Sequence, residues 1–214
     1  DFRKDMDELE KKNEALEKKE DLPNTDKEEQ DIQSEMQNSS ESLDSKKNGK
    51  ASKSQKNAAQ KMDQMAQQMS KMQQQMQQEQ AEEDMKAMRA LLENLLRLSF
   101  DQEKVMQDLR TMDINNPQYL KMSQQQRKLK DDAKMIEDSL FALSKRVIQI
   151  QSKVNQEIAA VNQNMDEALS NLEDRTVSQA RSRQQFVMTA VNNLTLMLSE
   201  ALQQMQQQQA SAMP

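Results

Sequence analysis

A single glycine, Gly49, in 214 residues is the feature that most limits how this chain can fold. Hairpins and tight turns depend on glycine because it adopts positive φ angles without a steric penalty. A sheet protein of this length would need many such turns, so the near absence of glycine argues against β-sheets. Abundant Gln, Met, Leu, Lys, Glu and Ala, most of which favour helices, predict an all-α protein.

Apolar residues recur in heptads along three long segments, which predicts helices at about residues 55–112, 118–173 and 177–207. The second segment is the most regular, with Leu, Ile, Val and Ala at steps of three and four from Leu129 to Leu172. The break before it contains Asn116, a good N-cap, and Pro117, which suits a first helical position. Near Asp174 no strong breaker is present. A turn is favoured there over a straight continuation, because Asp174 and Thr176 are both N-cap types.

Matched helix lengths favour an antiparallel hairpin. The first two predicted helices are each on the order of 56 residues and are joined by a short loop. We therefore expect an elongated antiparallel coiled-coil hairpin with a third packed helix at residues 177–207. The heptad phase slips between Gln77 and Asp84, which indicates a change of winding or of packing partner.

The predicted organisation has four parts. Residues 1–44 form an acidic region with short charged helices, in which Leu22-Pro23-Asn24 ends the first helix and a second runs from Asp26 to about Leu43. Residues 45–54, which include Gly49, form a flexible linker. The antiparallel helical bundle covers residues 55–208, and residues 209–214 form a tail.

Composition excludes several classes of function. Residues 1–50 carry 10 basic and 16 acidic residues, so they hold the whole net charge of -6 and the rest is neutral. A neutral bundle is no nucleic-acid footprint, and no apolar run is long enough to span a membrane. Without Cys and His the segment has no Ser–His or Cys–His pair, so we expect no enzyme activity and no cofactor. A small-molecule substrate is not expected either.

A stripe of five methionines is the candidate interaction site. Its members alternate by three and four residues, as core positions of a coiled coil do: Met62, Met65, Met69, Met72 and Met76. Thioethers can bind Cu(I), but methionines at this spacing with no Cys or His nearby favour helix packing over a metal site. Because methionine packs adaptably, the stripe is where a protein partner is expected. In the hairpin it would face residues 154–172.

Other polar side chains are assigned to the surface. The acidic run of Glu79, Glu82, Glu83 and Asp84 lacks the spacing of a calcium loop. The glutamine runs at residues 73–75, 124–126 and 206–209 are expected on outer faces. Arg175, Arg181 and Arg183 are interpreted as surface charges, with an anchor for an acidic segment, such as the N-terminal region, as the alternative.

Part of the sequence resembles a known family. The stretch from Leu95 to Leu202 contains INNPQYL and SRQQFVMTAVNNLTLMLSEAL. It is similar to the C-terminal helical part of a family of very large proteins of unknown function from Bacteroidetes-type bacteria. The resemblance implies N-terminal transmembrane helices in the parent protein and a place in the bacterial cell envelope. It leaves the side of the membrane open, and the periplasmic side is our expectation. It implies no activity and no site residues. The chain is expected to be a piece of such a protein.

The leading functional hypothesis is a structural or scaffolding coiled-coil module that acts through helix–helix association with a protein partner or with itself. Two alternatives remain open. The chain could bind a membrane surface reversibly through amphipathic helices, although few aromatics and a neutral bundle disfavour this. It could also be a regulatory arm of an ATPase elsewhere in the parent chain.

Overall fold

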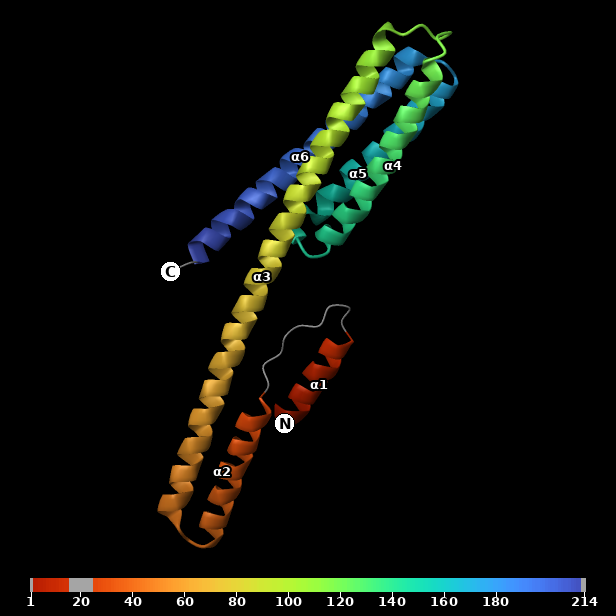
Figure 1. Cartoon of the computed structure of the whole chain (residues 1–214). Coiled ribbons are helices and arrows are strands. Elements are labelled where there is room, and N and C mark those ends of the chain that lie inside the picture. The colour runs from red at the N-terminus through yellow and green to blue at the C-terminus, as the bar shows by residue number, and fades with distance from the viewer. Residues whose placement is uncertain (1, 16–24, 213–214) are drawn as a thin grey trace. The chain divides into compact units, whose positions relative to one another are not determined.

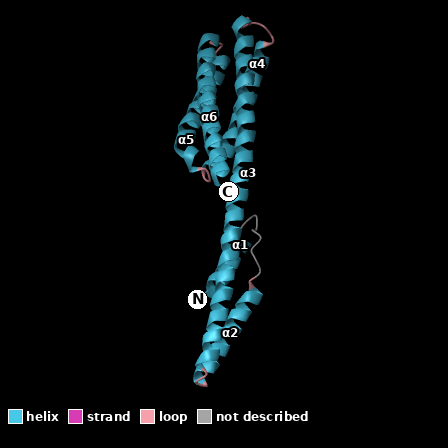
Figure 2. Cartoon of the chain, turned by 90° about the vertical axis from the view of Figure 1, so that its left-hand side faces the viewer, coloured by secondary structure: helices cyan, strands magenta, loops and turns pink. Residues whose placement is uncertain are grey.

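The computed structural model describes residues 2–15 and 25–212, and these residues form six helices and no strands (Figures 1 and 2). The predicted all-α class is confirmed. The chain divides into two compact units, Asp1–Gln77 and Gln78–Pro214. The boundary lies inside one helix, α3 (Asn48–Thr111), at the start of the predicted phase slip. The slip is thus where α3 changes its packing partners. The predicted single bundle over residues 55–208 is wrong in this respect.

The N-terminal unit contains α1 (Phe2–Glu14), α2 (Asp26–Asp44) and the first part of α3. The predicted helix end at Leu22-Pro23-Asn24 lies outside the described residues. The helices α2 and α3 form an antiparallel hairpin. Asn57 Nδ2 donates to Glu35 Oε1 at 3.1 Å, and Lys61 Nζ donates to Asp31 Oδ2. The hydrogen bond from Lys61 and the positive charge of that lysine hold the pKa of Asp31 below its ordinary value.

Heptad spacing accounts for the residues that the hairpin buries. On α2 these are Ile32 and Ser39, seven residues apart, and on α3 they are Ala51, Ala58 and Met65. Small side chains at three of these five positions let the two backbones approach closely. The hairpin therefore buries little apolar surface, and its seam is narrow.

The turn between α2 and α3 overturns the predicted flexible linker at residues 45–54. The helix α3 already begins at Asn48, and only residues 45–47 lie between the helices. Lys46 adopts a positive φ of 53°. Its N–H donates to Leu43 O at 2.9 Å and that of Lys47 donates to Ser42 O at 2.7 Å, which is the Schellman pattern. A lysine thus takes the place that glycine usually occupies, while Gly49 lies within the helix.

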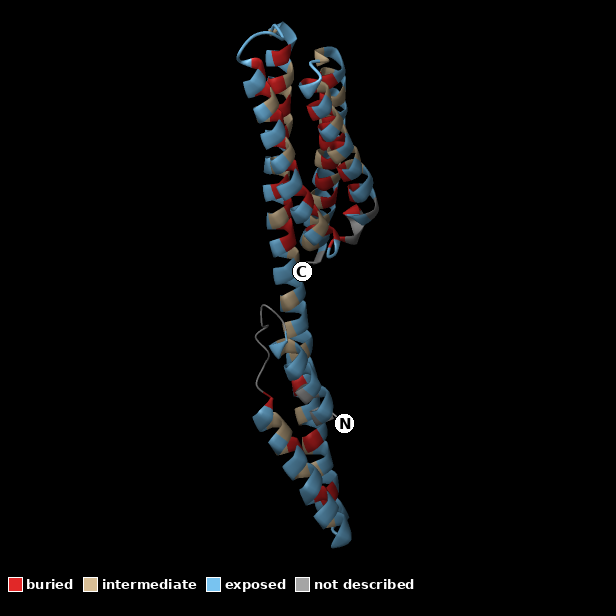
Figure 3. Ribbon diagram, turned by 90° about the vertical axis from the view of Figure 1, so that its right-hand side faces the viewer, coloured by how far each residue is buried: buried red, intermediate tan, exposed pale blue. Residues whose placement is uncertain are grey.

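The C-terminal unit contains residues 78–111 of α3 together with α4 (Tyr119–Ser144), α5 (Ile148–Glu173) and α6 (Val177–Ala212). Successive helices are antiparallel, and ion pairs link them along their length, such as Arg127–Glu173 between α4 and α5 and Glu167–Arg183 between α5 and α6. Their inward positions form one continuous apolar core, coloured red in Figure 3. The unit is a closed four-helix bundle.

The predicted second long helix at 118–173 is wrong, because it is two helices. The helix α4 ends at Ser144 and α5 begins at Ile148. No Gly or Pro marks this turn, and the heptad pattern continues through it, since Leu143, Val147 and Ile150 are all buried at the end of the bundle. Folding back places the Leu/Ile/Val seam of α5 in the same core as those of α3 and α4. A straight helix would have packed that seam on methionine and glutamine.

The other predicted turns are confirmed, with shifted bounds. Asn116 Oδ1 accepts a hydrogen bond from the Gln118 N–H at 2.8 Å, but α4 begins at Tyr119 instead of Pro117. The chain turns after Glu173, where Arg175 has a positive φ of 59°. The helix α6 continues to Ala212, so residues 209–212 of the predicted tail are helical. Residues 213–214 lie outside the described residues.

Tyr119 joins the α3–α4 turn to the end of α5. Its buried hydroxyl donates to the Leu172 carbonyl at 2.9 Å, and the same carbonyl accepts the Arg175 N–H at 3.2 Å just beyond the end of α5. Burial raises the pKa of the phenol above its ordinary value, although the nearby Arg175 opposes this. The neutral phenol is therefore the form that the folded protein stabilises.

We expect Tyr119→Phe to lower the free energy of unfolding by about 1 kcal/mol at neutral pH, through loss of this hydrogen bond. The unfolded tyrosine ionises near pH 10 while the folded one stays protonated, so unfolding becomes easier as the pH rises above that value. The difference in stability between wild type and Tyr119→Phe should therefore shrink above pH 10. Urea titrations at pH 7 and at pH 10.5 measure it, and a constant difference would contradict the assignment.

Gly49 lies three residues after Lys46, the left-handed turn position at which glycine is usually favoured. Lys46→Gly should stabilise the N-terminal unit by about 1 kcal/mol, because it removes a left-handed lysine. Gly49→Ala should add about 0.5–1 kcal/mol, because the position is helical and a Cβ there meets no atom within 4 Å. Helix content and melting temperature by circular dichroism test both variants. Destabilisation by Gly49→Ala would place the residue in a non-helical segment.

Candidate interaction site

The structure divides the five predicted methionines between two positions on α3. Met65 is only 4% exposed and belongs to the narrow seam of the hairpin, where it packs as a core residue of the helix pair. Met62 is 45% exposed, and Met69, Met72 and Met76 are half-buried. None of the five belongs to the core cluster that contains residues 154–172, as far as the described residues show. The predicted packing of the stripe on that segment is therefore wrong.

The hairpin has two further large apolar side chains that are exposed like Met62, and both belong to α2. Met36 is 52% exposed and Leu43 is 50% exposed. Each follows, by four residues, a buried position of α2 (Ile32 or Ser39), and Met62 likewise follows Ala58. In an antiparallel helix pair, positions four residues after the seam lie on the same side of both helices. Met36, Leu43 and Met62 therefore lie on one side of the hairpin.

The opposite side of the hairpin is polar. It carries the Glu35–Asn57 and Asp31–Lys61 hydrogen bonds. It also carries a shallow hollow lined by Asn38, Glu41, Lys50, Lys53 and neighbouring polar residues. The hairpin thus has one charged, paired side and one uncharged side on which Met36, Leu43 and Met62 are exposed.

We name this second side the uncharged flank. The same helical positions on both helices hold no charged residue over this length, although 31% of the chain is charged. Asp26 and Glu29, at the start of α2, lie just beyond one end of the uncharged flank. All members of the flank are exposed in the structure: Gln33, Met36, Ser40, Leu43, Asn48, Ser52, Gln55, Ala59 and Met62.

A buried glutamine layer fixes the register of the C-terminal bundle. Gln102 of α3 and Gln126 of α4 exchange two side-chain hydrogen bonds of 2.9 and 2.8 Å. Gln184 Nε2 of α6 donates to Gln126 Oε1 at 2.8 Å, and Gln126 Nε2 also contacts Met165 Sδ of α5 at 3.1 Å. All four residues are fully buried. The prediction that residues 124–126 lie on an outer face is therefore wrong for Gln126.

A signal for this layer is present in the sequence. In α6 the buried residues Ala180 and Val187 are seven residues apart, and Gln184 holds the core position between them, where an apolar residue would be expected. Gln126 likewise precedes Leu129 by three residues. A polar residue at a core position costs stability but selects one register and one set of partners, because only one alignment pairs its amide.

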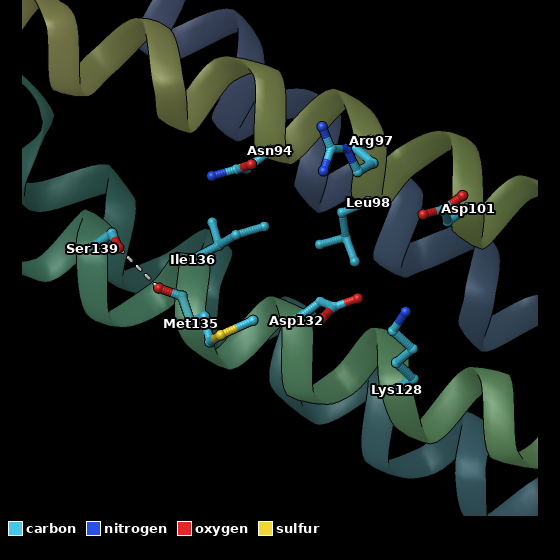
Figure 4. Close-up of a pocket in the computed structure, with 9 residues that line it drawn as sticks. All are labelled: Asn94, Arg97, Leu98, Asp101, Lys128, Asp132, Met135, Ile136 and Ser139. Carbon is cyan, nitrogen blue, oxygen red and sulfur yellow. Dashed lines mark hydrogen bonds between the residues drawn. The ribbon is translucent and has the colours of Figure 1, made fainter.

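A groove with a volume of about 360 Å³ lies between α3 and α4 in the C-terminal unit. Figure 4 shows Leu98 and Ile136 pointing toward one another across it, while Arg97 and Asp132 lie at its rim. Ser139 Oγ donates to the Met135 carbonyl at 3.0 Å within α4. The groove combines an apolar floor with balanced charges. Its lining contains no nucleophile paired with a base, so it has the character of a helix-packing groove.

Two of the charged residues singled out earlier, Asp84 and Arg183, have structural partners. Asp84 is buried and accepts from Arg146 Nε at 2.8 Å, which ties the α4–α5 turn to α3. Arg183 pairs with Glu167 at 2.7 Å and lies over the Phe186 ring. The Nε of Arg181 is buried without a hydrogen-bond partner. These contacts support a structural role for Asp84 and Arg183.

In residues 2–15 and 25–212, no group of three or more His, Cys, Asp or Glu side chains is placed to hold a metal ion. No helix within the same residues is long and apolar enough to cross a bilayer.

Comparisons with known proteins identify no relative. No protein-family model matches the chain, and neither a curated protein nor a solved structure shows significant similarity to it. The resemblance to the Bacteroidetes-type family therefore stays a prediction.

Gln126 is the centre of the glutamine layer, so its loss should be costly. Gln126→Leu leaves the amides of Gln102 and Gln184 buried without their partner, and we expect a loss of about 2–4 kcal/mol in the free energy of unfolding. Replacing all three glutamines by Leu removes every stranded polar group and should restore stability to the wild-type value or above. Urea denaturation measures each variant.

Gln184→Met provides the matched control. The Oε1 of Gln184 has no hydrogen-bond partner, and Gln126 Oε1 still accepts from Gln102 when Gln184 is replaced. Its effect on stability should therefore be within about 1 kcal/mol of zero. A Gln126→Leu variant as stable as Gln184→Met would show that the layer is not paired in this way.

Proposed function

We propose that this chain is a structural module that acts through helix–helix association, with a helical protein surface as its partner. The observation that carries the proposal is the contrast between the two units. The C-terminal bundle encloses one continuous apolar core, whereas the hairpin buries only a narrow seam and has Met36, Leu43 and Met62 about half exposed on one side. A soluble surface gains nothing from such a stripe, but a helical partner would bury it.

The C-terminal bundle has the properties of a rigid support. Its glutamine layer admits one register, and its core is continuous from Met88 to Leu198. The hairpin has a narrow seam of small side chains and offers methionines, which adapt to a partner surface. In this proposal the bundle anchors the module and the hairpin binds. The place of the module in a larger bacterial envelope protein rests on the sequence resemblance alone.

Site-specific photo-crosslinking tests association. A photoreactive amino acid at Met62 should yield covalent protein adducts of the full chain in the producing cell, because a partner covers this side chain. The same residue at Leu196, which is 63% exposed on α6 of the closed bundle, is the control and should yield none. Equal labelling at both positions, or no adduct at Met62, would overturn the proposal.

A further inference from the structure

The single glycine of the sequence directly follows an asparagine, and this pair, Asn48-Gly49, begins the helix α3. Both residues are exposed, and a Cβ added at Gly49 would meet no atom within 4 Å. Water and hydroxide therefore reach the Asn48 carboxamide and the Gly49 nitrogen from open solvent. The turn itself does not need the glycine, because the residue with a positive φ is Lys46.

The backbone nitrogen of Gly49 is free to react. The first N–H groups of a helix have no acceptor within that helix. In the part of the chain that the structure describes, the N–H groups of Asn48 and Gly49 donate no hydrogen bond, and the Asn48 side chain makes none either. Because glycine has no Cβ, nothing shields its nitrogen from the carbonyl carbon of a neighbouring side chain.

The helix holds Asn48 in place only weakly. Ring closure between the Asn48 side chain and the next nitrogen needs a ψ angle outside the helical range. Two hydrogen bonds oppose this rotation, and the Lys47 carbonyl accepts both, from the Lys50 N–H at 3.0 Å and from the Ala51 N–H at 3.2 Å. They lie at the end of the helix, where fraying is common. Their loss releases Asn48 and leaves the rest of α3 intact.

Positive charge surrounds the pair. Lys46, Lys47 and Lys50 are exposed, and none of them is paired with a carboxylate of the described chain. Their charges stabilise the amide anion that attacks and the negative charge that develops on the carboxamide oxygen, although solvent screens this effect. The four observations together favour one reaction, attack of the Gly49 nitrogen on Asn48.

We propose that Asn48 is a site of spontaneous deamidation. The Gly49 nitrogen loses its proton to hydroxide and bonds to the side-chain carbonyl carbon of Asn48, which forms a five-membered succinimide. The bond from that carbon to the amide nitrogen breaks, and the nitrogen takes a proton from water and leaves as ammonia, which regenerates the hydroxide. Water then opens the ring at the side-chain carbonyl to give aspartate, or at the main-chain carbonyl to give isoaspartate. One water is consumed for each ammonia released.

The two products have different effects on α3. Aspartate at this position places a negative charge in a first turn that holds no acidic residue, and such a charge stabilises a helix. Isoaspartate directs the backbone through the side chain and adds one carbon to it, so the regular first turn is lost. Either product adds a negative charge to the uncharged flank, to which Asn48 belongs. The proposal needs no partner and is independent of the proposed function.

Ageing of the full chain at about pH 8, followed by peptide mapping with mass spectrometry, tests the proposal. We expect Asn48 to convert to a mixture of aspartate and isoaspartate. Its half-life should be within about a hundredfold of that in an unstructured peptide of residues 45–52, because only two hydrogen bonds protect it. Conversion should be slower at about pH 6, since hydroxide starts the reaction.

Two other asparagines of the hairpin are internal controls and should keep their amides. Asn38 lies within α2 and precedes the buried Ser39. The Asn57 side chain donates to Glu35, and the next residue, Ala58, is buried.

Gly49→Ala tests whether the Gly49 nitrogen is the attacking group. It should slow the conversion at least about tenfold, because a Cβ hinders ring closure, while α3 keeps its helix content. Ser52→Ala, at an exposed position one turn further along α3, is the matched control and should leave the rate unchanged. Protection of Asn48 by more than about a hundredfold relative to the peptide overturns the proposal. Equal conversion at Asn38, or a rate that Gly49→Ala does not lower, overturns it as well.

Discussion

The paired amides of Gln102 and Gln126 are the interaction on which the C-terminal bundle depends. They are fully buried, and each amide finds its hydrogen bonds only when α3 and α4 are aligned at this one register. One heptad from the layer, Leu95, Ala133, Ile158 and Val191 are all buried. One heptad in the other direction, the Tyr119 hydroxyl reaches Leu172 O. Polar pairing in one layer thus sets the apolar contacts of the others.

The two units use the same heptad repeat to different ends. Leu, Ile and Val dominate the closed bundle, where branched side chains of defined shape favour one packing arrangement. Ala, Ser and Met dominate the hairpin, whose seam is narrow and whose flank is exposed and uncharged. The first arrangement encloses a continuous apolar core, whereas the second buries only a narrow seam. This difference in side-chain chemistry supports the division into an anchor and a binding element.

The turns show where sequence reasoning succeeds and fails. Asn116 and Pro117 marked the α3–α4 turn, and the N-cap types around Asp174 favoured the next one. The turn at residues 145–147 carries no such residue, and its hydrogen bonds to Leu143 O close it with ordinary side chains. The positive φ of Lys46 is equally invisible in composition, because the energy of packing outweighs about 1–2 kcal/mol of local strain. Both failures have the same cause, which is that packing elsewhere determines the local backbone.

The sequence by itself determined the helical class, the heptad seams and the phase slip after Gln77, because these depend on residue types and their periodicity. It also contained a polar residue at a core position of α6, Gln184, although its amide partner Gln126 lies 58 residues away in the chain. Only the tertiary structure decided that the seam from Val147 to Leu172 folds back into one core, and that Met65 is buried while Met62 is exposed. The physical reason is that periodicity defines which face of a helix is apolar, whereas the competition among apolar faces decides which of them meet.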